Sequence, residues 1–273
     1  MFSYTDKPLI MGILNVTPDS FSDGGKFTDF NIALQQVLRM QAEGVDIIDI
    51  GGESTRPGSD PVSEIEQIQR VLPVITAIRQ QLNCELAISI DTTSSVVAKA
   101  ALDAGATMIN DVSGGTADPA ILTLAATTNT PIILMHSKGT PKTMQDHPYY
   151  DDVIAEVIAA LKQCVAAALE AGIKKENIIL DPGIGFGKRK QDNFSLLAHL
   201  DALVALGFPV LLGASRKRFM GTLCDVSEPS ELVTATAVTT ALGVMAGVQL
   251  FRVHDVKENR QAADVAYAIR QSR

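Results

Sequence analysis

Residues 86–91 read LAISID, an apolar run of strand length that ends in a carboxylate. Similar runs recur along the chain, each followed by a polar or glycine-rich turn and then by a segment with helical periodicity. The eight runs span residues 8–14, 45–50, 86–90, 106–109, 131–135, 177–180, 209–212 and 248–251. Strands that alternate with helices run parallel, because a crossover helix returns the chain in the same direction. The pattern therefore predicts an α/β fold, a closed (β/α)8 TIM barrel.

The segments between these runs complete the barrel prediction. Helical periodicity covers residues 30–42, 63–81, 94–104, 119–127, 152–171, 194–206, 230–246 and 258–270. Such a barrel needs about 250 residues, so one barrel takes up the whole chain of 273 residues. No linker divides the sequence, and we expect residues 1–273 to form a single domain. The connections after the first and second strands, 15–29 and 51–61, are long enough to be functional loops.

The composition argues against several classes of function. A net charge of −8 gives no electrostatic footprint for nucleic acid, so local positive charge must hold any anionic ligand. Cys84, Cys164 and Cys224 are widely spaced, which favours reduced core residues of a cytoplasmic protein over disulfides or a zinc knuckle. The sequence does not open with a signal-peptide pattern. Residues 232–251 are uncharged, but their threonines and glycines fit a helix, a turn and a strand better than a membrane span, so we expect no membrane partner.

Polar side chains follow every predicted strand. A parallel barrel brings the carboxyl ends of its strands to one face, so these side chains are expected to converge there. They are Asn15, Gly51 with Thr55 and Arg56, Asp91, Asn110, His136, Asp181, Ser215 with Lys217, and Arg252 with His254.

Three of these strand ends carry groups that suit a flat heterocycle. Asp91, Asn110 and Asp181 offer acceptors and donors for the N–H and C=O edge of a ring. The alternative is helix capping, because both aspartates precede helices or turns. Three such residues at equivalent positions favour a ligand site.

Lys217 lies within three successive basic residues, 216–218, just past the seventh predicted strand. A lysine at this place in a barrel can bind phosphate, donate to a ligand ring or form a Schiff base. The alternative is a solvated helix start. The helix dipole opposes positive charge in a first turn, which favours the functional interpretations.

Arg252 and His254 directly precede a helix expected to begin near residue 255. The free N–H groups of a helix N-terminus, together with a guanidinium and an imidazole, predict a phosphate or pyrophosphate site. A lone histidine here would more often be structural, but Arg252 two residues away, and the frequent binding of phosphate after strands seven and eight of barrel enzymes, favour an anion site.

Two further features are less diagnostic. For His136 the sequence supports a pocket-lining role and a structural role equally, and no histidine-rich set supports zinc. Residues 183–188 read GIGFGK but fail the Walker pattern, because Arg189 stands where a Ser or Thr would hold magnesium. This glycine-rich segment is expected to let backbone approach a bound ligand.

Two long motifs resemble those of the dihydropteroate synthases. Residues 12–25 read GILNVTPDSFSDGG, and residues 49–58 read DIGGESTRPG. The similarity continues at residues 89–92, 109–111, 135–136, 139–141, 181–188, 213–217 and 252–255. It extends from the first strand to the eighth, in order, and is far more specific than any single motif.

The resemblance implies an enzyme of folate biosynthesis that joins 6-hydroxymethyl-7,8-dihydropterin pyrophosphate to 4-aminobenzoate and releases pyrophosphate. It implies Mg²⁺ as the cofactor, sulfonamides as inhibitors that mimic 4-aminobenzoate, and a homodimer formed through outer helices.

The resemblance also implies roles for individual residues. The pterin would be held by Asp91, Asn110, Met135, Asp181, Phe186, Gly213 and Lys217. The diphosphate would be held by Thr55, Arg252 and His254, and 4-aminobenzoate by Phe21, Arg56, Pro57 and Ser215. Asn15 would ligate the metal, with Asp23 near the metal and the incoming amine. The catalytic residues would be Asp23, Lys217, Asp91 and Asp181.

The chemistry agrees with these roles. Pyrophosphate leaves readily once Mg²⁺ and cations neutralise it, and the pterin shares the positive charge that develops on its methylene carbon. Asp91 and Asp181 would favour that cation. An arylamine is already nucleophilic, and the long first and second loops would exclude water.

Three alternatives remain at this stage. Another pterin-binding barrel, such as a methyltetrahydrofolate methyltransferase, would share the Asp, Asn, Asp pocket but lack the loop 15–25 and the run 215–217. A Schiff-base aldolase would use Lys217. A non-catalytic pterin-binding protein would have lost Asn15, Arg252 or the loops.

Overall fold

Parallel strands form the centre of the structure, a computed structural model that describes residues 7–16, 26–54, 58–82, 84–139, 143–144 and 146–273. The strands are β1 (Leu9–Asn15), β2 (Ile47–Gly51), β3 (Ala87–Asp91), β4 (Met108–Asp111), β5 (Ile132–Met135), β6 (Ile178–Asp181), β7 (Leu211–Leu212) and β8 (Leu250–Val253). Their order in the sheet is β6-β5-β4-β3-β2-β1-β8-β7. A parallel bridge between Leu180 and Val210 joins the two ends of the sheet, as a barrel requires. The predicted TIM barrel is confirmed.

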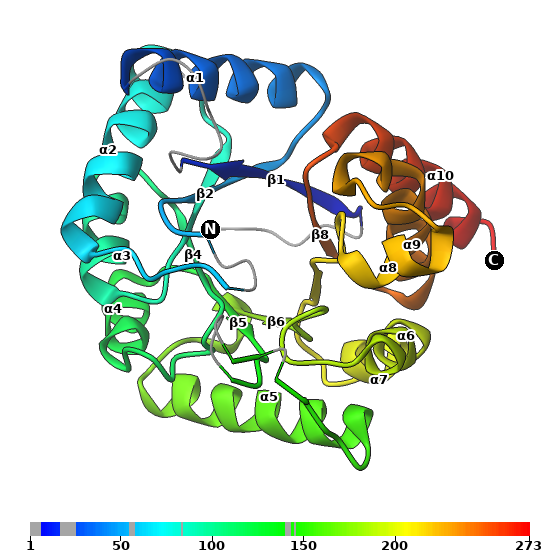
Figure 1. Cartoon of the computed structure of the whole chain (residues 1–273). Coiled ribbons are helices and arrows are strands. Elements are labelled where there is room, and N and C mark those ends of the chain that lie inside the picture. Colours follow the sequence, from blue (N-terminus) through cyan, green and yellow to red (C-terminus); the bar gives the residue numbers. More distant parts are fainter. Residues whose placement is uncertain (1–6, 17–25, 55–57, 83, 140–142, 145) are drawn as a thin grey trace.

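Helices surround these strands as an outer ring (Figure 1). They are α1 (Lys26–Ala42), α2 (Glu64–Gln80), α3 (Ser95–Asp103), α4 (Ala120–Thr128), α5 (Val153–Glu170), α6 (Lys190–Ala198), α7 (Leu200–Val204), α8 (Arg218–Cys224), α9 (Val233–Ala246) and α10 (Val256–Gln271). Each predicted strand run contains an observed strand. The helix α8 lies in a segment that the periodicity did not assign to a helix.

The single helix predicted over residues 194–206 is wrong, because the structure breaks it into α6 and α7 at His199. The His199 ring nitrogen Nδ1 donates to the Ser195 carbonyl at 2.8 Å. A continuing α-helix would offer that carbonyl to the His199 backbone N–H. The backbone N–H instead donates to Leu196 O at 3.2 Å, which tightens and ends the helix.

The barrel interior is filled by a layer of buried apolar side chains: Met11, Ile47, Met108, Ile133, Ile179, Leu211 and Leu250. Side chains two positions apart on a strand point to the same face of the sheet. The next inward-facing layer, toward the carboxyl ends of the strands, is therefore Ile13, Asp49, Asn110, Met135, Asp181, Gly213 and Arg252. Most of this layer consists of residues that the sequence assigns to a ligand site.

The uncharged stretch 232–251 forms a helix, a turn and a strand, as predicted. It comprises α9, a left-handed turn at Gly247 with φ of 98° and the start of β8. Among the helices that the structure describes, none is long and apolar enough to cross a membrane.

The cysteines agree only in part with the prediction of core residues. All three thiols are free, and Cys84 is buried. Cys224 is exposed, because it ends the unpredicted helix α8 at the surface.

Candidate active site

Four of the predicted site positions lie side by side across the first four strands. Strand pairing aligns Asn15 with Gly51, Gly51 with Asp91 and Asp91 with Asn110. Asp91 and Asn110 are buried, whereas Asn15 is half-buried. The predicted convergence of these strand ends is therefore observed.

The alternative of helix capping is wrong for Asp91. The N-cap of α3 is Ser94, whose Oγ accepts the Val97 N–H at 3.3 Å. Lys217 is likewise not a solvated helix start, although it is the N-cap residue of α8. Its ammonium lies 4.2 Å from the centroid of the Phe186 ring, a cation–π contact.

Arg252, on β8, reaches past β1 to carboxylates on β2 and β3. Its Nε donates to Asp49 Oδ2 at 2.6 Å, and its Nη2 donates to Asp91 Oδ2 at 2.6 Å. Asn110 Nδ2 lies 3.3 Å from the same Asp49 oxygen. Asp49 is completely buried, and we did not identify it from the sequence, where it stands inside an apolar run. The signal that could have identified Asp49 is its spacing: it stands two positions after Ile47, so both side chains point into the barrel.

This network keeps Arg252 charged and shifts the protonation of Asp91. Burial raises the pKa of Asp91, and the attraction of Arg252 only partly offsets that rise. The negative charge of the nearby Asp49 carboxylate also raises the pKa of Asp91. Burial also disfavours the charged form of Arg252, but the two carboxylates raise its pKa by more, so the guanidinium remains charged.

Asp181 and Lys217 form the opposite side of the mouth. Asp181 Oδ1 accepts the Gly183 N–H at 2.7 Å. One oxygen of Asp181 therefore caps the turn that follows β6, which is the alternative role considered for this residue. Burial raises the pKa of Asp181 to about 6, against the effect of that hydrogen bond. Burial and then Arg252 lower the pKa of Lys217 to about 8. Gly213 lies next to the same carboxylate: a Cβ on it would be 3.7 Å from Asp181 Oδ2 and would occupy the space beside that oxygen.

The ends of β7 and β8 are joined by hydrogen bonds. Ser215 Oγ accepts the backbone N–H of His254 at 3.1 Å and lies 2.9 Å from His254 Nδ1. Ser215 is buried and His254 half-buried. The residue predicted for 4-aminobenzoate thus touches one predicted for the diphosphate, which indicates that the two ligands would be neighbours.

Arg216 and Asp255 form a second link between the same loops. The guanidinium of Arg216 contacts both carboxylate oxygens of Asp255, at 2.9 and 2.5 Å. Arg216 has a left-handed backbone with φ of 56°, and its N–H donates to Thr236 Oγ1 at 3.1 Å. This ion pair was not predictable from the sequence, and it anchors the segment in which Arg216 stands between Ser215 and Lys217.

Several predicted site residues lie outside the described residues. They are Phe21, Asp23, Thr55, Arg56 and Pro57. Their roles stay predictions from the sequence.

The oxygen donors at the mouth of the barrel suit a metal ion that is bound mainly by the phosphates of a substrate. The described residues contain no group of three or more His, Cys, Asp or Glu side chains that could hold a metal ion. The amide oxygen of Asn15 is present at the end of β1, 3.6 Å from where a Cβ on Gly51 would lie. Mg²⁺ is typically bound by one or two protein oxygens together with substrate phosphates, so these residues fit that mode.

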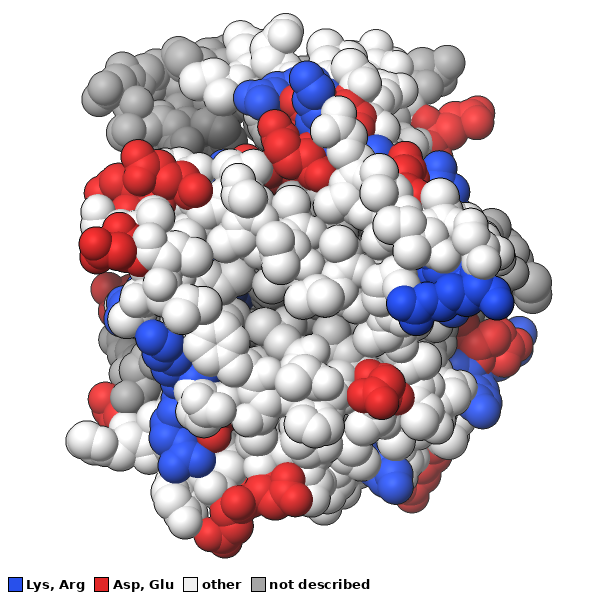
Figure 2. All heavy atoms as spheres, turned by 90° about the vertical axis from the view of Figure 1, so that its right-hand side faces the viewer, with Lys and Arg blue, Asp and Glu red and all other residues white. Residues whose placement is uncertain are grey.

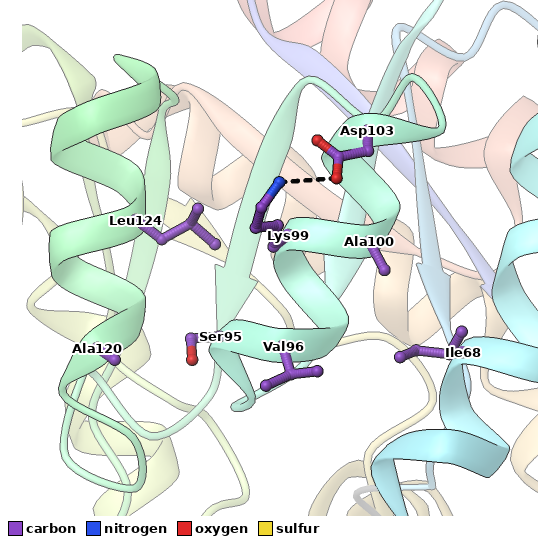
Figure 3. Close-up of a pocket in the computed structure, with 8 residues that line it drawn as sticks. All are labelled: Ile68, Ser95, Val96, Lys99, Ala100, Asp103, Ala120 and Leu124. Atoms are coloured by element: carbon purple, nitrogen blue, oxygen red, sulfur yellow. Dashed lines mark hydrogen bonds and ion pairs between the residues drawn. The ribbon is translucent and has the colours of Figure 1, made fainter.

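A separate hollow lies on the outside of the barrel, between α2, α3 and α4 (Figure 3). It has a volume of about 450 Å³ and is lined by Ile68, Val96, Leu124 and the ion pair of Lys99 with Asp103. None of the predicted site residues that the structure describes lines it, so we place the active site at the strand ends.

Comparison with known proteins identifies similar enzymes. The model of the family described as pterin binding enzyme matches residues 11–254. The dihydropteroate synthase of Synechocystis sp. is 47% identical over 269 residues, which cover 98% of this chain and 92% of the relative.

Solved structures are similar over nearly the whole chain. The dihydropteroate synthase of Clostridium difficile, determined in the presence of pteroic acid, has a TM-score of 0.92 at 44% identity and covers 98% of this chain and 99% of its own. The Yersinia pestis enzyme in complex with a sulfonamide drug has a TM-score of 0.91 at 43% identity, covering 97% and 95%. The Xanthomonas albilineans enzyme with 4-aminobenzoic acid has a TM-score of 0.90 at 45% identity, covering 97% and 93%.

Proposed function

This chain belongs to the dihydropteroate synthases, pterin-binding enzymes that join 6-hydroxymethyl-7,8-dihydropterin pyrophosphate to 4-aminobenzoate, and we propose that its reaction takes place at the carboxyl ends of the barrel strands. The observation that carries this proposal is the convergence of buried Asp91, Asn110 and Asp181 with Lys217. Family membership sets aside the methyltransferase, the Schiff-base aldolase and the non-catalytic binder.

The pterin ring would lie between Asp181 and Asn110. Their carboxylate and amide oxygens would accept its N–H groups, and the Lys217 ammonium would donate to a ring oxygen or nitrogen. Met135 lies on the same inward face, and the Phe186 ring under Lys217 would bound the slot. This arrangement would fix both the edge and the plane of a flat ligand.

Arg252, His254 and Thr55 would hold the diphosphate. A guanidinium has five N–H donors, and only two of those of Arg252 are used by Asp49 and Asp91 at 2.6 Å. The carboxylates would therefore orient the side chain while other donors meet phosphate oxygens. The N-terminus of α10, directly after His254, would add to the attraction for an anion.

Asn15 would hold Mg²⁺ against the diphosphate. The ion would supply positive charge that makes pyrophosphate a better leaving group.

The protein's own groups would direct the substitution. The bond between the pterin methylene carbon and the diphosphate oxygen breaks, and the electron pair leaves with pyrophosphate. Asp91 and Asp181 would stabilise the cationic methylene, which the pterin ring shares. The amine of 4-aminobenzoate would then bond to this carbon and lose a proton. From the sequence resemblance, Asp23 would lie near the amine, and the second substrate would be held by Phe21, Arg56, Pro57 and Ser215.

A homodimer through α9 and α10 is part of this proposal. Val238, Leu242, Val265 and Ile269 are each more than half exposed, at 53%, 60%, 61% and 53%. The face that bears these helices has few charged side chains at its centre (Figure 2). Contiguous apolar surface of this kind is typical of protein interfaces. A cytoplasmic location also belongs to the proposal and is supported by the free thiols.

The test is incubation of the enzyme with the pterin pyrophosphate, 4-aminobenzoate and Mg²⁺, with dihydropteroate and pyrophosphate both measured. We expect equal amounts of the two products. Absence of product at high enzyme concentration would refute the proposed function.

A further inference from the structure

Lys188 is a buried lysine at the end of the glycine-rich segment 183–188, and its side chain is not one that the proposed reaction uses. The residue is 3% exposed. Its Nζ lies 2.8 Å from Gly183 O, 3.0 Å from Phe186 O and 2.9 Å from His136 Nδ1. A longer contact of 3.4 Å reaches the His136 carbonyl. The ammonium is therefore surrounded by backbone carbonyls and an imidazole.

This geometry assigns the protonation of His136. An ammonium has three N–H donors, and carbonyl oxygens can only accept. Burial lowers the pKa of Lys188 to about 7, and the attraction of Asp181 partly opposes that shift. While Lys188 is protonated, two of its donors are directed to Gly183 O and Phe186 O and the third meets Nδ1 of His136, so Nδ1 accepts. The imidazole is then neutral with its hydrogen on Nε2. Burial, and then the charge of Lys188, lower the pKa of His136 to about 3, in agreement.

The segment around Lys188 packs directly on the end of β5. Gly183 and Gly187 both have a left-handed backbone, with φ of 66° and 61°. A Cβ on Gly183 would collide with the His136 carbonyl, and one on Gly187 with the Lys138 carbonyl. Only glycine allows this close approach, and the lysine fixes the fold of the segment from inside.

The outer side of the same segment faces the proposed pterin slot. Gly183 N–H binds Asp181 at 2.7 Å, and the Phe186 ring lies 4.2 Å below the Lys217 ammonium. A Cβ on Gly185 would lie 3.1 Å from Lys217 Cδ. The segment 183–188 thus has the Lys188 ammonium on its inner side. On its outer side it contacts Asp181 and Lys217 and carries the Phe186 ring.

We propose that Lys188, paired with His136, is a positioning residue for the pterin: its ammonium holds the segment 183–188 in the shape that places Phe186 and Lys217 against the ring. The inference rests on the proposed function, since it assumes that the pterin binds there. It also gives His136 a role as a fixed hydrogen-bond acceptor.

The test compares Lys188→Met with Lys190→Met, which removes an exposed lysine two positions away at the start of α6. Leaving buried carbonyls and an imidazole without their donor is expected to raise KM for the pterin pyrophosphate about 10- to 100-fold, with KM for 4-aminobenzoate much less affected. Lys190→Met is expected to leave both constants unchanged. A Lys188→Met enzyme with wild-type KM for the pterin, or with both KM values raised equally, would overturn the proposal.

Two further measurements cover a variant that does not fold. His136→Phe keeps a ring but removes the acceptor, and it is expected to raise the pterin KM in the same direction by about threefold or more. The ¹⁵N spectrum of the wild-type enzyme should show His136 with Nδ1 unprotonated and Nε2 protonated at a pH below the Lys188 pKa of about 7, where Lys188 keeps its charge and the imidazole is still neutral. A proton on Nδ1 would overturn the inference. A wild-type enzyme that does not bind 6-hydroxymethyl-7,8-dihydropterin at all would instead refute the proposed function.

Discussion

Arg252 Nε on β8 donates to Asp49 Oδ2 on β2 at 2.6 Å, past the intervening strand β1 at the mouth of the barrel. Asp49 is fully buried, so its charge is balanced by protein groups rather than by bulk water. The same guanidinium also reaches Asp91 at 2.6 Å. The guanidinium that we propose to bind the diphosphate is thus held in place by two carboxylates.

The first prediction concerns this pair. Asp49→Asn leaves Arg252 with one carboxylate partner in a buried site, and we expect it to lower the free energy of unfolding by about 3 kcal/mol. Urea denaturation at pH 7 measures the change. The control is Asp103→Asn, which breaks the exposed ion pair with Lys99 and should cost about 0.5 kcal/mol or less. Equal, small effects of the two substitutions would show that the Arg252 network does not stabilise the barrel.

The second prediction concerns the pH dependence of pterin binding. The pKa of Lys217 is lowered to about 8, so its ammonium loses its proton as the pH rises through that value. Wild type should bind 6-hydroxymethyl-7,8-dihydropterin about tenfold or more tightly than Lys217→Met at pH 7, because a charged donor is lost. The ratio of the two Kd values should shrink as the pH rises above 8. The titration of the ligand itself is common to both proteins and cancels in the ratio. A ratio that is constant from pH 7 to pH 9.5 would mean that Lys217 does not act through its charge.

Sulfonamides provide the third prediction. They share the aromatic amine and the anionic end of 4-aminobenzoate, and a relative has been solved with such a drug. Initial-rate measurements should show that a sulfonamide raises KM for 4-aminobenzoate and leaves kcat unchanged. Inhibition that persists at saturating 4-aminobenzoate would argue against the assigned second-substrate site.

The fourth prediction concerns the α9 and α10 face. Leu242→Asp places a charge in the apolar surface and should convert a dimer to a monomer in sedimentation experiments, because a buried unpaired charge costs several kcal/mol. Leu169→Asp on α5 is the control, since Leu169 is also exposed, at 45%, but lies outside this face. A wild-type monomer, or a Leu242→Asp dimer, would refute the interface.

The positions of the strand ends were predictable from two general rules. Side chains alternate between the faces of a strand, and parallel strands bring their carboxyl ends to one face of a barrel. They brought Asp91, Asn110 and Asp181 to one face without any knowledge of their contacts. Asp49 was missed because it interrupts an apolar run, where a charged side chain is easily taken for a surface residue.

Contacts between residues that are far apart in the chain could not be predicted from the sequence. Arg216 and Asp255 are 39 positions apart, and neither residue type predicts its partner. The helix α8 has only 7 residues and no side-chain cap, so it carries neither periodicity nor a capping signal. The break at His199 depends on a side-chain bond that competes with the backbone, which apolar periodicity cannot reveal.

The most direct test of the account is a crystal structure of the enzyme with 6-hydroxymethyl-7,8-dihydropterin. We predict that the edge of the ring lies within hydrogen-bond distance of Asn110 and Asp181, with its plane beside Lys217. A pterin bound elsewhere, such as in the hollow between α2 and α4, would contradict the assignment of the active site to the strand ends.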